Sequence, residues 1–195
     1  MKTVTARLQR NLDASIRAMQ ELKSQNDTLA TFATAVAATV DAYRNGRRIY
    51  IAGNGGSAAD AQHLAAEFVS KLARDRAPLA AEALTTDSSI LTAIGNDYGY
   101  DQVFARQLLG KAVAGDIFLG ISTSGQSPNI LRALEQCRRM GVPSIVFLGR
   151  DGGLALPLAD YGIVVPGQAT STIQELHIVL AHTLCECVEA AIFGD

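Results

Sequence analysis

The chain has 195 residues, of which 48% are hydrophobic and 18% are charged, and its net charge is −2. This length and composition are typical of one globular domain with a sizeable core, and a charge so close to zero argues against a broad surface for nucleic acid or membrane. No apolar run reaches the length that a membrane span needs, and Arg7 and Arg10 interrupt any signal-like start. We therefore expect a cytoplasmic protein that binds neither nucleic acid nor membrane.

The first 45 residues predict two helices. Apolar residues recur at helical spacing on both sides of Asn26-Asp27, namely Leu8, Leu12, Ile16 and Met19 before it and Leu29, Phe32, Val36 and Val40 after it. We expect residues 1–46 to form an N-terminal helical pair and residues 47–195 to form an α/β core, together one domain. A helical pair placed before the first strand often packs on a neighbouring subunit.

Residues 49–71 predict a strand, a tight turn and a helix. Residues 49–52 read as a buried strand, glycines and a serine follow at 53–57, and an alanine-rich helical pattern begins at once. Glycine permits positive φ, and the start of a helix offers free N–H groups and the positive end of a dipole, so an anion is the expected ligand. His63 and Glu67 stand four residues apart on one face of this helix, close enough to act together.

The remaining pattern alternates strands with helices. Strands are predicted at 78–84, 117–121, 144–148 and 161–165, and helices at 87–94, 101–113, from Pro128 onwards, 154–159 and 172–192. This alternation predicts the α/β class, with a five-stranded parallel sheet flanked by helices. Ligands of such sheets bind beyond the carboxyl ends of the strands, where the polar loops fall.

The second polar loop, residues 122–127, follows the predicted strand 117–121. The hydroxyl groups of Ser122, Thr123, Ser124 and Ser127, with the N–H groups of the next helix, make a phosphate cradle that needs no lysine or arginine. The alternative is an ordinary capped turn, with Ser127 as N-cap before Pro128 at the first helical position. Two such loops at successive strand ends favour a phosphorylated ligand. Neither loop has the Walker or the dinucleotide-binding pattern.

The final helix is apolar on nearly every side, so we expect it to be buried. Gln174 could be the third residue of a capping box that starts at Ser171, or it could face a site. His177 and His182 lie on either side of Gln174 around this helix, and periodicity does not choose between them. The cysteines, Cys137, Cys185 and Cys187, are odd in number and lack metal-type spacing, so we expect buried free thiols.

Five segments in the same order closely resemble the phosphoheptose isomerases of the sugar isomerase (SIS) domain family. They are residues 52–63, 66–68, 95–100, 121–125 and 173–177, joined by His182. The resemblance implies a single SIS-type domain that isomerises D-sedoheptulose 7-phosphate to D-glycero-D-manno-heptose 7-phosphate in the biosynthesis of bacterial surface-glycan heptose. It also implies a homotetramer with sites at subunit interfaces.

The resemblance further implies roles for particular residues. Glu67 matches the family's base, and His182 rather than His177 matches its acid. The zinc ligands would be His63, Glu67, Gln174 and His182, with one zinc in each subunit. The substrate contacts would be Asn54, Gly55, Gly56, Ser57, Glu67, Asn96, Asp97, Gln174 and the phosphate-binding hydroxyls of Ser122, Thr123, Ser124 and Ser127. Ser171 departs from the pattern, because some relatives carry an acidic residue there.

The implied reaction suits these residue types. Moving a carbonyl from C2 to C1 requires a base that takes a proton from C1, an enediol-like intermediate and the return of a proton at C2. Two other functions are open to an SIS chain: a non-catalytic partner of the bacterial replication initiator, or a sugar-phosphate sensor. The first resembles this chain around Asn54 and Ser122 but lacks the Glu and His pair, and the second would need a DNA-binding segment, which we do not find. Glu67 and His182 therefore favour the enzyme.

Overall fold

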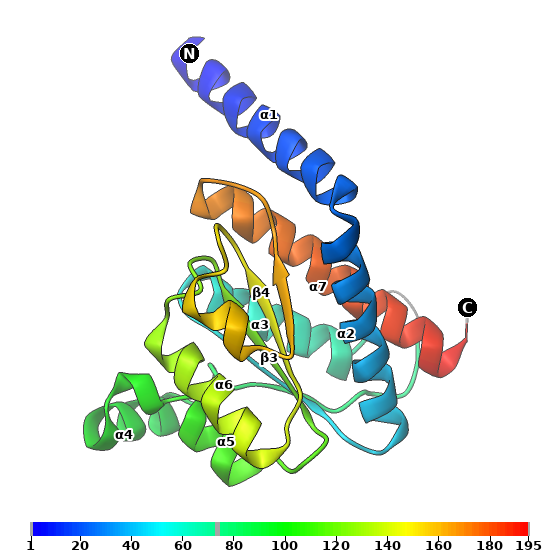
Figure 1. The fold of residues 1–195 in the computed structure, drawn as a ribbon, viewed down its shortest axis with the longest axis vertical. Helices are drawn as coiled ribbons and strands as arrows, with labels where there is room; N and C mark the ends of the chain where they lie inside the picture. Colours follow the sequence, from blue (N-terminus) through cyan, green and yellow to red (C-terminus); the bar gives the residue numbers. More distant parts are fainter. Residues whose placement is uncertain (1, 73–74, 195) are drawn as a thin grey trace.

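The protein is described by a computed structural model that covers residues 2–72 and 75–194 (Figure 1). Two helices lead into a five-stranded sheet that is covered on both faces. In chain order the elements are α1 (Lys2–Ser24), α2 (Asn26–Arg44), β1 (Ile49–Gly53), α3 (Gly56–Val69), β2 (Ala81–Ala83), α4 (Ser88–Tyr98), η1 (Tyr100–Gln102), α5 (Ala105–Lys111), β3 (Ile117–Ser122), α6 (Pro128–Met140), β4 (Ser144–Leu148), η2 (Gly153–Leu158), β5 (Tyr161–Val164) and α7 (Thr170–Phe193).

The sheet is parallel throughout, in the order β2-β1-β3-β4-β5. The predicted α/β class with five parallel strands is therefore confirmed. From β1 the chain first builds β2 on one side and then β3 on the other, so the direction of strand addition reverses there. A crevice opens beyond the carboxyl ends of strands at such a switch point. The two polar loops follow β1 and β3, the two strands that border it.

Alternate residues of each strand enter different halves of the core, because successive strand side chains point to opposite faces. Ile49 and Ile51 of β1 pack in the half that includes side chains from α2, α3 and α7. Tyr50 and Ala52 pack in the half that includes side chains from α5 and α6. Helices α3 and α7 thus lie on the same face of the sheet and contact each other (Figure 1).

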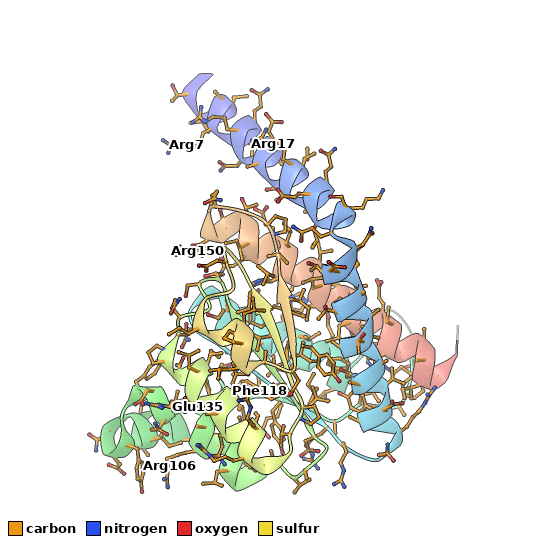
Figure 2. All side chains as sticks on the ribbon, viewed as in Figure 1. Arg7, Arg17, Arg106, Phe118, Glu135 and Arg150 are labelled. Atoms are coloured by element: carbon orange, nitrogen blue, oxygen red, sulfur yellow. The ribbon has the colours of Figure 1, made fainter. Side chains whose placement is uncertain are left out.

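Helix α1 extends away from the body of the molecule, and Figure 2 shows the side chains of Arg7 and Arg17 on this projecting part. It is tied to α7 where the hydroxyl of Ser15 donates to the carboxylate of Glu175. One stripe of α1 is apolar and exposed, made of Val4, Leu8, Leu12, Ile16 and Met19. The predicted helical pair is confirmed, while the boundary between residues 46 and 47 stays a prediction.

The predicted second strand, 78–84, was too long. The ladder of β2 is confined to Ala81–Ala83, because the preceding chain is drawn towards α3, where the Leu79 N–H donates to the carbonyl of Phe68 over 3.0 Å. Pro78 in turn has no N–H to offer a ladder. The predicted helix 87–94 was too short, since α4 continues through Tyr98 until Gly99 ends it at φ +92°.

The predicted helix 101–113 is two elements, η1 and α5. Helix α5 stops at Lys111, because the carboxylate of Asp116 accepts the N–H of Val113 over 2.9 Å and turns the chain towards β3. The same carboxylate accepts the N–H of Arg48 over 3.1 Å, which ties this turn to the start of β1.

The final helix, α7, begins two residues earlier than predicted. By length and composition alone it could cross a membrane, so the expectation that no segment is long enough was wrong on that criterion. Its position in the fold accounts for its composition. Ile173, Leu176, Leu180 and Leu184 lie in the core formed with α2, α3 and the sheet, and the core helix of a soluble protein passes the same test.

The three cysteines differ in burial. Cys137 and Cys185 are free and buried as predicted, and burial raises the pKa of each thiol to about 12. Cys187 is free but exposed, so the prediction of a buried thiol was wrong there. Two residues correspond to about 200° around a helix, which turns Cys187 away from the core that holds Cys185.

His177 is a core residue, 1% exposed, with its ring 6.1 Å from that of Phe147. Burial lowers its pKa from 6.5 to about 4. The unfolded chain therefore binds a proton in this pH range that the folded chain does not, so the free energy of unfolding should fall as pH falls from 6.5 towards 4. The loss should be about 3 kcal/mol at most. In His177→Leu this contribution should vanish.

Denaturant titrations of both proteins across this pH range test the prediction. Other groups titrate here too, so the informative quantity is the difference between the two pH profiles. Parallel profiles would show that His177 takes up its proton equally well in the folded and unfolded chains.

Candidate active site

The glycine loop after β1 is shaped by close approach of the backbone. A Cβ at Gly53 would lie 2.5 Å from the carbonyl oxygen of Ser57, and Gly55 has φ +57°. The carbonyl of Asn54 accepts the N–H of Ser57 over 3.1 Å, which starts α3 directly at the loop. Gly55 and Gly56 are exposed, so the loop presents its backbone N–H groups at the crevice, while Ser57 at the start of α3 is buried.

The side chain of Asn54 is held by Asn129 of α6. Their carboxamides exchange two hydrogen bonds, of 2.9 and 2.8 Å, and the Tyr100 hydroxyl lies 3.4 Å from the Asn54 Oδ1. Asn129 is 3% exposed, and it links the loop after β1 to the helix that follows β3. Sequence reasoning missed it. The available signal was a polar residue directly after Pro128, inside a helix that is otherwise apolar on this face.

The serine loop after β3 is closed by its own hydroxyls. Ser122 Oγ accepts the N–H of Gly125 over 3.1 Å and lies 3.2 Å from Ser127 Oγ, and Ser124 Oγ accepts the N–H of Gln126 over 3.2 Å. Ser127 is at the N-cap position with Pro128 next, as predicted, yet its side chain makes no capping bond. The ordinary capped turn is thus not what Ser127 forms.

Glycine is required at the centre of this loop. Gly125 has φ +62°, and a Cβ there would overlap the carbonyl of Gly152. The tight turn gathers the hydroxyls of Ser122, Thr123, Ser124 and Ser127 within six residues at the end of β3. A serine hydroxyl that accepts one N–H can still donate its own proton, so the loop can offer several donors to a phosphate.

A carboxylate and two imidazoles meet between α3 and α7. Glu67 Oε1 lies 2.9 Å from His63 Nε2 and 3.3 Å from His182 Nε2. The Glu67 side chain is 10% exposed, against 50% for His63 and 39% for His182, so a ligand can reach the imidazoles while the carboxylate is shielded. The structure therefore brings the predicted base and acid together and separates His182 from the core histidine, His177.

The same three side chains could hold a metal ion. One ligand atom from each of His63, Glu67 and His182 lies within 4.8 Å of the others. Within the described part of the chain, Glu67 Oε2 is buried without a hydrogen-bond partner. A bound ion would satisfy this oxygen. Imidazole and carboxylate are ordinary donors for a divalent transition metal. The donor set fits such an ion.

Gln174 lies beside the glycine loop. A Cβ at Gly56 would overlap its carboxamide, so glycine at this position leaves room for that side chain. Ala169 is the N-cap of α7 and makes no side-chain capping bond, which places Ser171 inside the helix and removes the capping-box alternative. Gln174 thus contacts the predicted substrate loop, eight residues before His182 on the same helix.

Two predicted contacts lie elsewhere. Asn96 and Asp97 are exposed on α4, where the Asn96 carboxamide donates to the Asp97 carboxylate over 2.7 Å. From this part of the chain it is Tyr100, not Asn96 or Asp97, whose side chain contacts the glycine loop. A direct role for Asn96 and Asp97 at this site stays a prediction.

Asp60 is a further acidic group that sequence reasoning did not single out. It lies on α3 one turn before His63, and its Oδ2 is buried without a partner among the described residues. Burial raises the pKa of this carboxyl, and the proximity of His63 opposes that shift. Its spacing from His63 and Glu67 was visible in the sequence, but its burial was not.

The parallel sheet has polar loops on both sides of its switch point and an acid-base cluster beside them, which is the arrangement expected of an SIS domain. The chain belongs to the SIS domain family, whose profile matches residues 11–149.

The names of its relatives are more specific than the name of the family. The chain is 48% identical to the phosphoheptose isomerase of Aneurinibacillus thermoaerophilus over 185 residues, or 95% of this chain and 93% of the relative. It is 46% identical to phosphoheptose isomerase 2 of Campylobacter jejuni over 194 residues, or 100% and 96%. The structure of phosphoheptose isomerase GmhA from Neisseria gonorrhoeae matches with a TM-score of 0.90 at 40% identity, covering 96% of this chain and 99% of that one. The predicted family and SIS fold are confirmed.

Proposed function

We propose that the protein is a phosphoheptose isomerase, which converts D-sedoheptulose 7-phosphate to D-glycero-D-manno-heptose 7-phosphate. The observation that carries the proposal is the shielded carboxylate of Glu67, 3.3 Å from the imidazole of His182, on the helix that begins at the glycine loop. Relatives at 46% and 48% identity bear the same name. The non-catalytic alternative has no comparable support, because the Glu and His pair that such proteins lack is in place. The sensor alternative has none either, because the relatives at 46% and 48% identity are named as isomerases.

The residues of the chain suit each step. Glu67 removes the proton from C1 of the ketose and returns a proton at C2, so the carbonyl moves to C1 through an enediol. His182 exchanges protons with the sugar oxygens as their charge changes. The serine loop binds the phosphate at the far end of the substrate, and that binding energy holds the reacting carbons at Glu67. Asn54, Gly55, Gly56, Ser57 and Gln174 would contact the sugar between these two ends.

We propose zinc as the metal. His63, Glu67 and His182 would hold it, with Gln174 as the fourth ligand that the family resemblance implies. When bound, zinc supplies a Lewis acid that can polarise a sugar oxygen. Glutamine is an uncommon zinc ligand, and a carboxylate that binds zinc tightly is a weaker base.

Incubation with sedoheptulose 7-phosphate, with the aldose detected by NMR, tests the function and the metal together. We expect the aldose to form, and the rate after a chelator has removed the metal shows whether bound zinc activates or inhibits the reaction. Absence of the aldose, with metal restored, would contradict the proposed function. Full turnover after thorough chelation would remove zinc from the mechanism.

The protein is proposed to be a soluble, cytoplasmic homotetramer with sites at subunit interfaces, acting in surface-glycan heptose biosynthesis. The exposed apolar stripe of α1 supports assembly, because an isolated helix face of this kind is stabilised by a partner helix. We predict that Leu12→Glu, in the middle of the stripe, lowers the oligomer size measured by light scattering, because a charge there would be desolvated at the interface. Gln20→Glu, on an exposed polar position of the same helix, is the control. Unchanged size in Leu12→Glu would exclude the stripe from the interface.

A further inference from the structure

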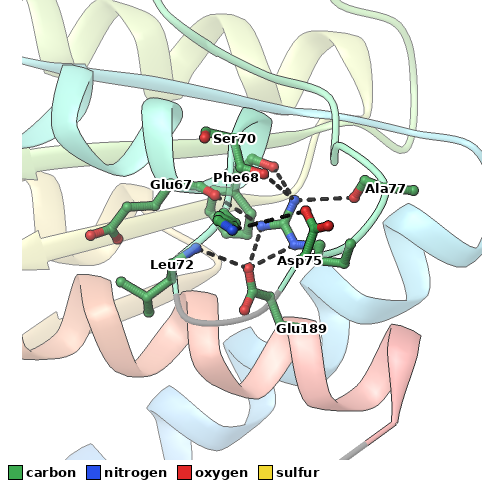
Figure 3. Close-up of polar contacts among 9 residues, drawn as sticks. Glu67, Phe68, Ser70, Leu72, Asp75, Ala77 and Glu189 are labelled. Carbon is green, nitrogen blue, oxygen red and sulfur yellow. Dashed lines mark hydrogen bonds and ion pairs between the residues drawn. The ribbon is translucent and has the colours of Figure 1, made fainter.

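The C-terminal end of α3, two residues after Glu67, is capped by a residue from the following segment. The last carbonyls of a helix have no partner inside the helix, and α3 has no basic residue in its last turn. Arg76 supplies the donors. Its guanidinium donates to the carbonyl of Glu67 over 2.9 Å and to that of Phe68 over 2.6 Å, as Figure 3 shows. It also reaches the carbonyl of Ala77 over 3.1 Å.

The same guanidinium is paired with Glu189 of α7. Arg76 Nε donates to Glu189 Oε1 over 2.7 Å, and Nη2 contacts the same oxygen. Glu189 Oε1 also accepts the N–H of Leu72 over 3.2 Å. The two side chains are 3% and 8% exposed, so this is a buried ion pair that joins the end of α3 to α7.

Both ends of this pair are close to the catalytic groups, Arg76 through its bonds to the end of α3 and Glu189 along α7. Arg76 bonds to the main chain of Glu67 itself, while the Glu67 carboxylate points away from the guanidinium in Figure 3. Glu189 follows His182 by seven residues, which is two helical turns on the same face. Cys185 lies between them on that face and is fully buried. A short rigid path therefore links the carbonyl of Glu67 to the backbone of His182.

Stability alone is a weak reason for such a pair. Removing two charges from water costs free energy, and apolar residues of similar size often replace buried ion pairs without loss of stability. Apolar side chains of α3 and α7 already share one core cluster, including Phe68 and Val188. The arginine adds a fixed orientation of the end of α3 relative to α7, because its planar guanidinium bonds several acceptors in a set geometry.

We propose that Arg76, through its pair with Glu189, is a positioning residue that fixes the Glu67 carboxylate against His182. A displacement of about 1 Å between reacting groups can lower a rate by about a hundredfold, and loss of a supporting contact typically weakens metal binding about tenfold or more. The part of this proposal that concerns turnover rests on the proposed isomerase function. The part that concerns the geometry of the His63, Glu67 and His182 cluster does not.

Arg76→Lys and Glu189→Gln test the proposal in the full-length protein. Lysine keeps the charge but cannot bond to the carboxylate and the carbonyls together, and glutamine keeps the shape but loses the charge. We expect kcat to fall by about tenfold or more while KM changes by less than about threefold, since the phosphate loop is untouched. The affinity for Zn²⁺, measured by competition with a chromophoric chelator, should fall by about tenfold.

The matched control is Leu134→Ala. Leu134 is 1% exposed and lies in α6, in the other half of the core. This change should lower the melting temperature without altering kcat or the affinity for Zn²⁺. If the Arg76 and Glu189 variants also lose only melting temperature, their role is structural and the proposal fails. If Arg76→Lys does not fold, Glu189→Gln decides.

The proposal and the proposed function fail separately. A wild-type protein that does not isomerise sedoheptulose 7-phosphate contradicts the function, and the Zn²⁺ titration then decides about Arg76. Wild-type turnover together with unchanged kcat and Zn²⁺ affinity in both variants overturns the positioning role and leaves the isomerase in place.

Discussion

Glu67→Gln is expected to reduce kcat by about a thousandfold, the middle of the roughly hundred- to ten-thousandfold range that a general base contributes. Glutamine has the shape of glutamate and can still lie between His63 and His182, but it cannot accept a proton. The phosphate loop is on another strand end, so the substrate should still bind. The measurements are kcat for aldose formation from sedoheptulose 7-phosphate and, separately, equilibrium binding of that substrate.

The control for this change is Glu186→Gln. Glu186 lies on α7, one turn after His182, and is exposed, so its loss removes a carboxylate near the site without touching the cluster. It should leave kcat unchanged. Turnover by Glu67→Gln at the wild-type rate would refute Glu67 as the base. Failure of the variant to bind substrate would show instead that the carboxylate mainly holds the sugar.

Ser124→Ala is expected to raise KM by about ten- to a hundredfold, because a hydrogen bond to a charged group contributes about 1.5–3 kcal/mol. In the structure Ser124 Oγ accepts the N–H of Gln126, so its own proton is free for a phosphate oxygen. The effect on kcat should be smaller, since the reacting carbons are at the other end of the substrate. Steady-state kinetics with sedoheptulose 7-phosphate measure both.

Two comparisons make this result specific to the phosphate. Ser89→Ala removes an exposed hydroxyl from α4 and should change neither constant. Unphosphorylated sedoheptulose should react slowly, because it lacks the phosphate, and should react equally with wild type and Ser124→Ala. A KM that stays at the wild-type value for the phosphorylated substrate would place the phosphate outside the serine loop.

Local patterns account for what could be predicted from the sequence. Strand-turn-helix signals at residues 49–71 and 117–128 predicted the two loops, and parallel strands with helical crossovers bring their carboxyl ends to one edge. The spacing of His63 and Glu67 placed both on one helix face. Periodicity left His177 and His182 open, and the family resemblance favoured His182. Packing separates them, because α7 turns His177 into the core and leaves His182 facing α3.

Contacts between distant segments account for what was missed. Asn129 and Asn54 are 75 residues apart in the sequence, and Arg76 and Glu189 are 113 apart, so no local pattern predicts either contact. The length of β2 depends on the bond of Leu79 to the end of α3, and Asp116 ends α5 by accepting the N–H of Val113. Burial of Asp60 and exposure of Cys187 likewise depend on which helix face is covered.

The central claim is that the Glu67 carboxylate breaks the C1–H bond of a sugar phosphate held by the serine loop. Sedoheptulose 7-phosphate carrying deuterium on C1 tests it most directly. NMR reports the loss of deuterium from C1, whether the deuteron is then transferred to C2 or exchanges with solvent. The account predicts that the wild-type protein removes one C1 deuteron as the aldose forms, and that Glu67→Gln binds the sugar and leaves the label intact. Loss of the label at the wild-type rate in Glu67→Gln would contradict it.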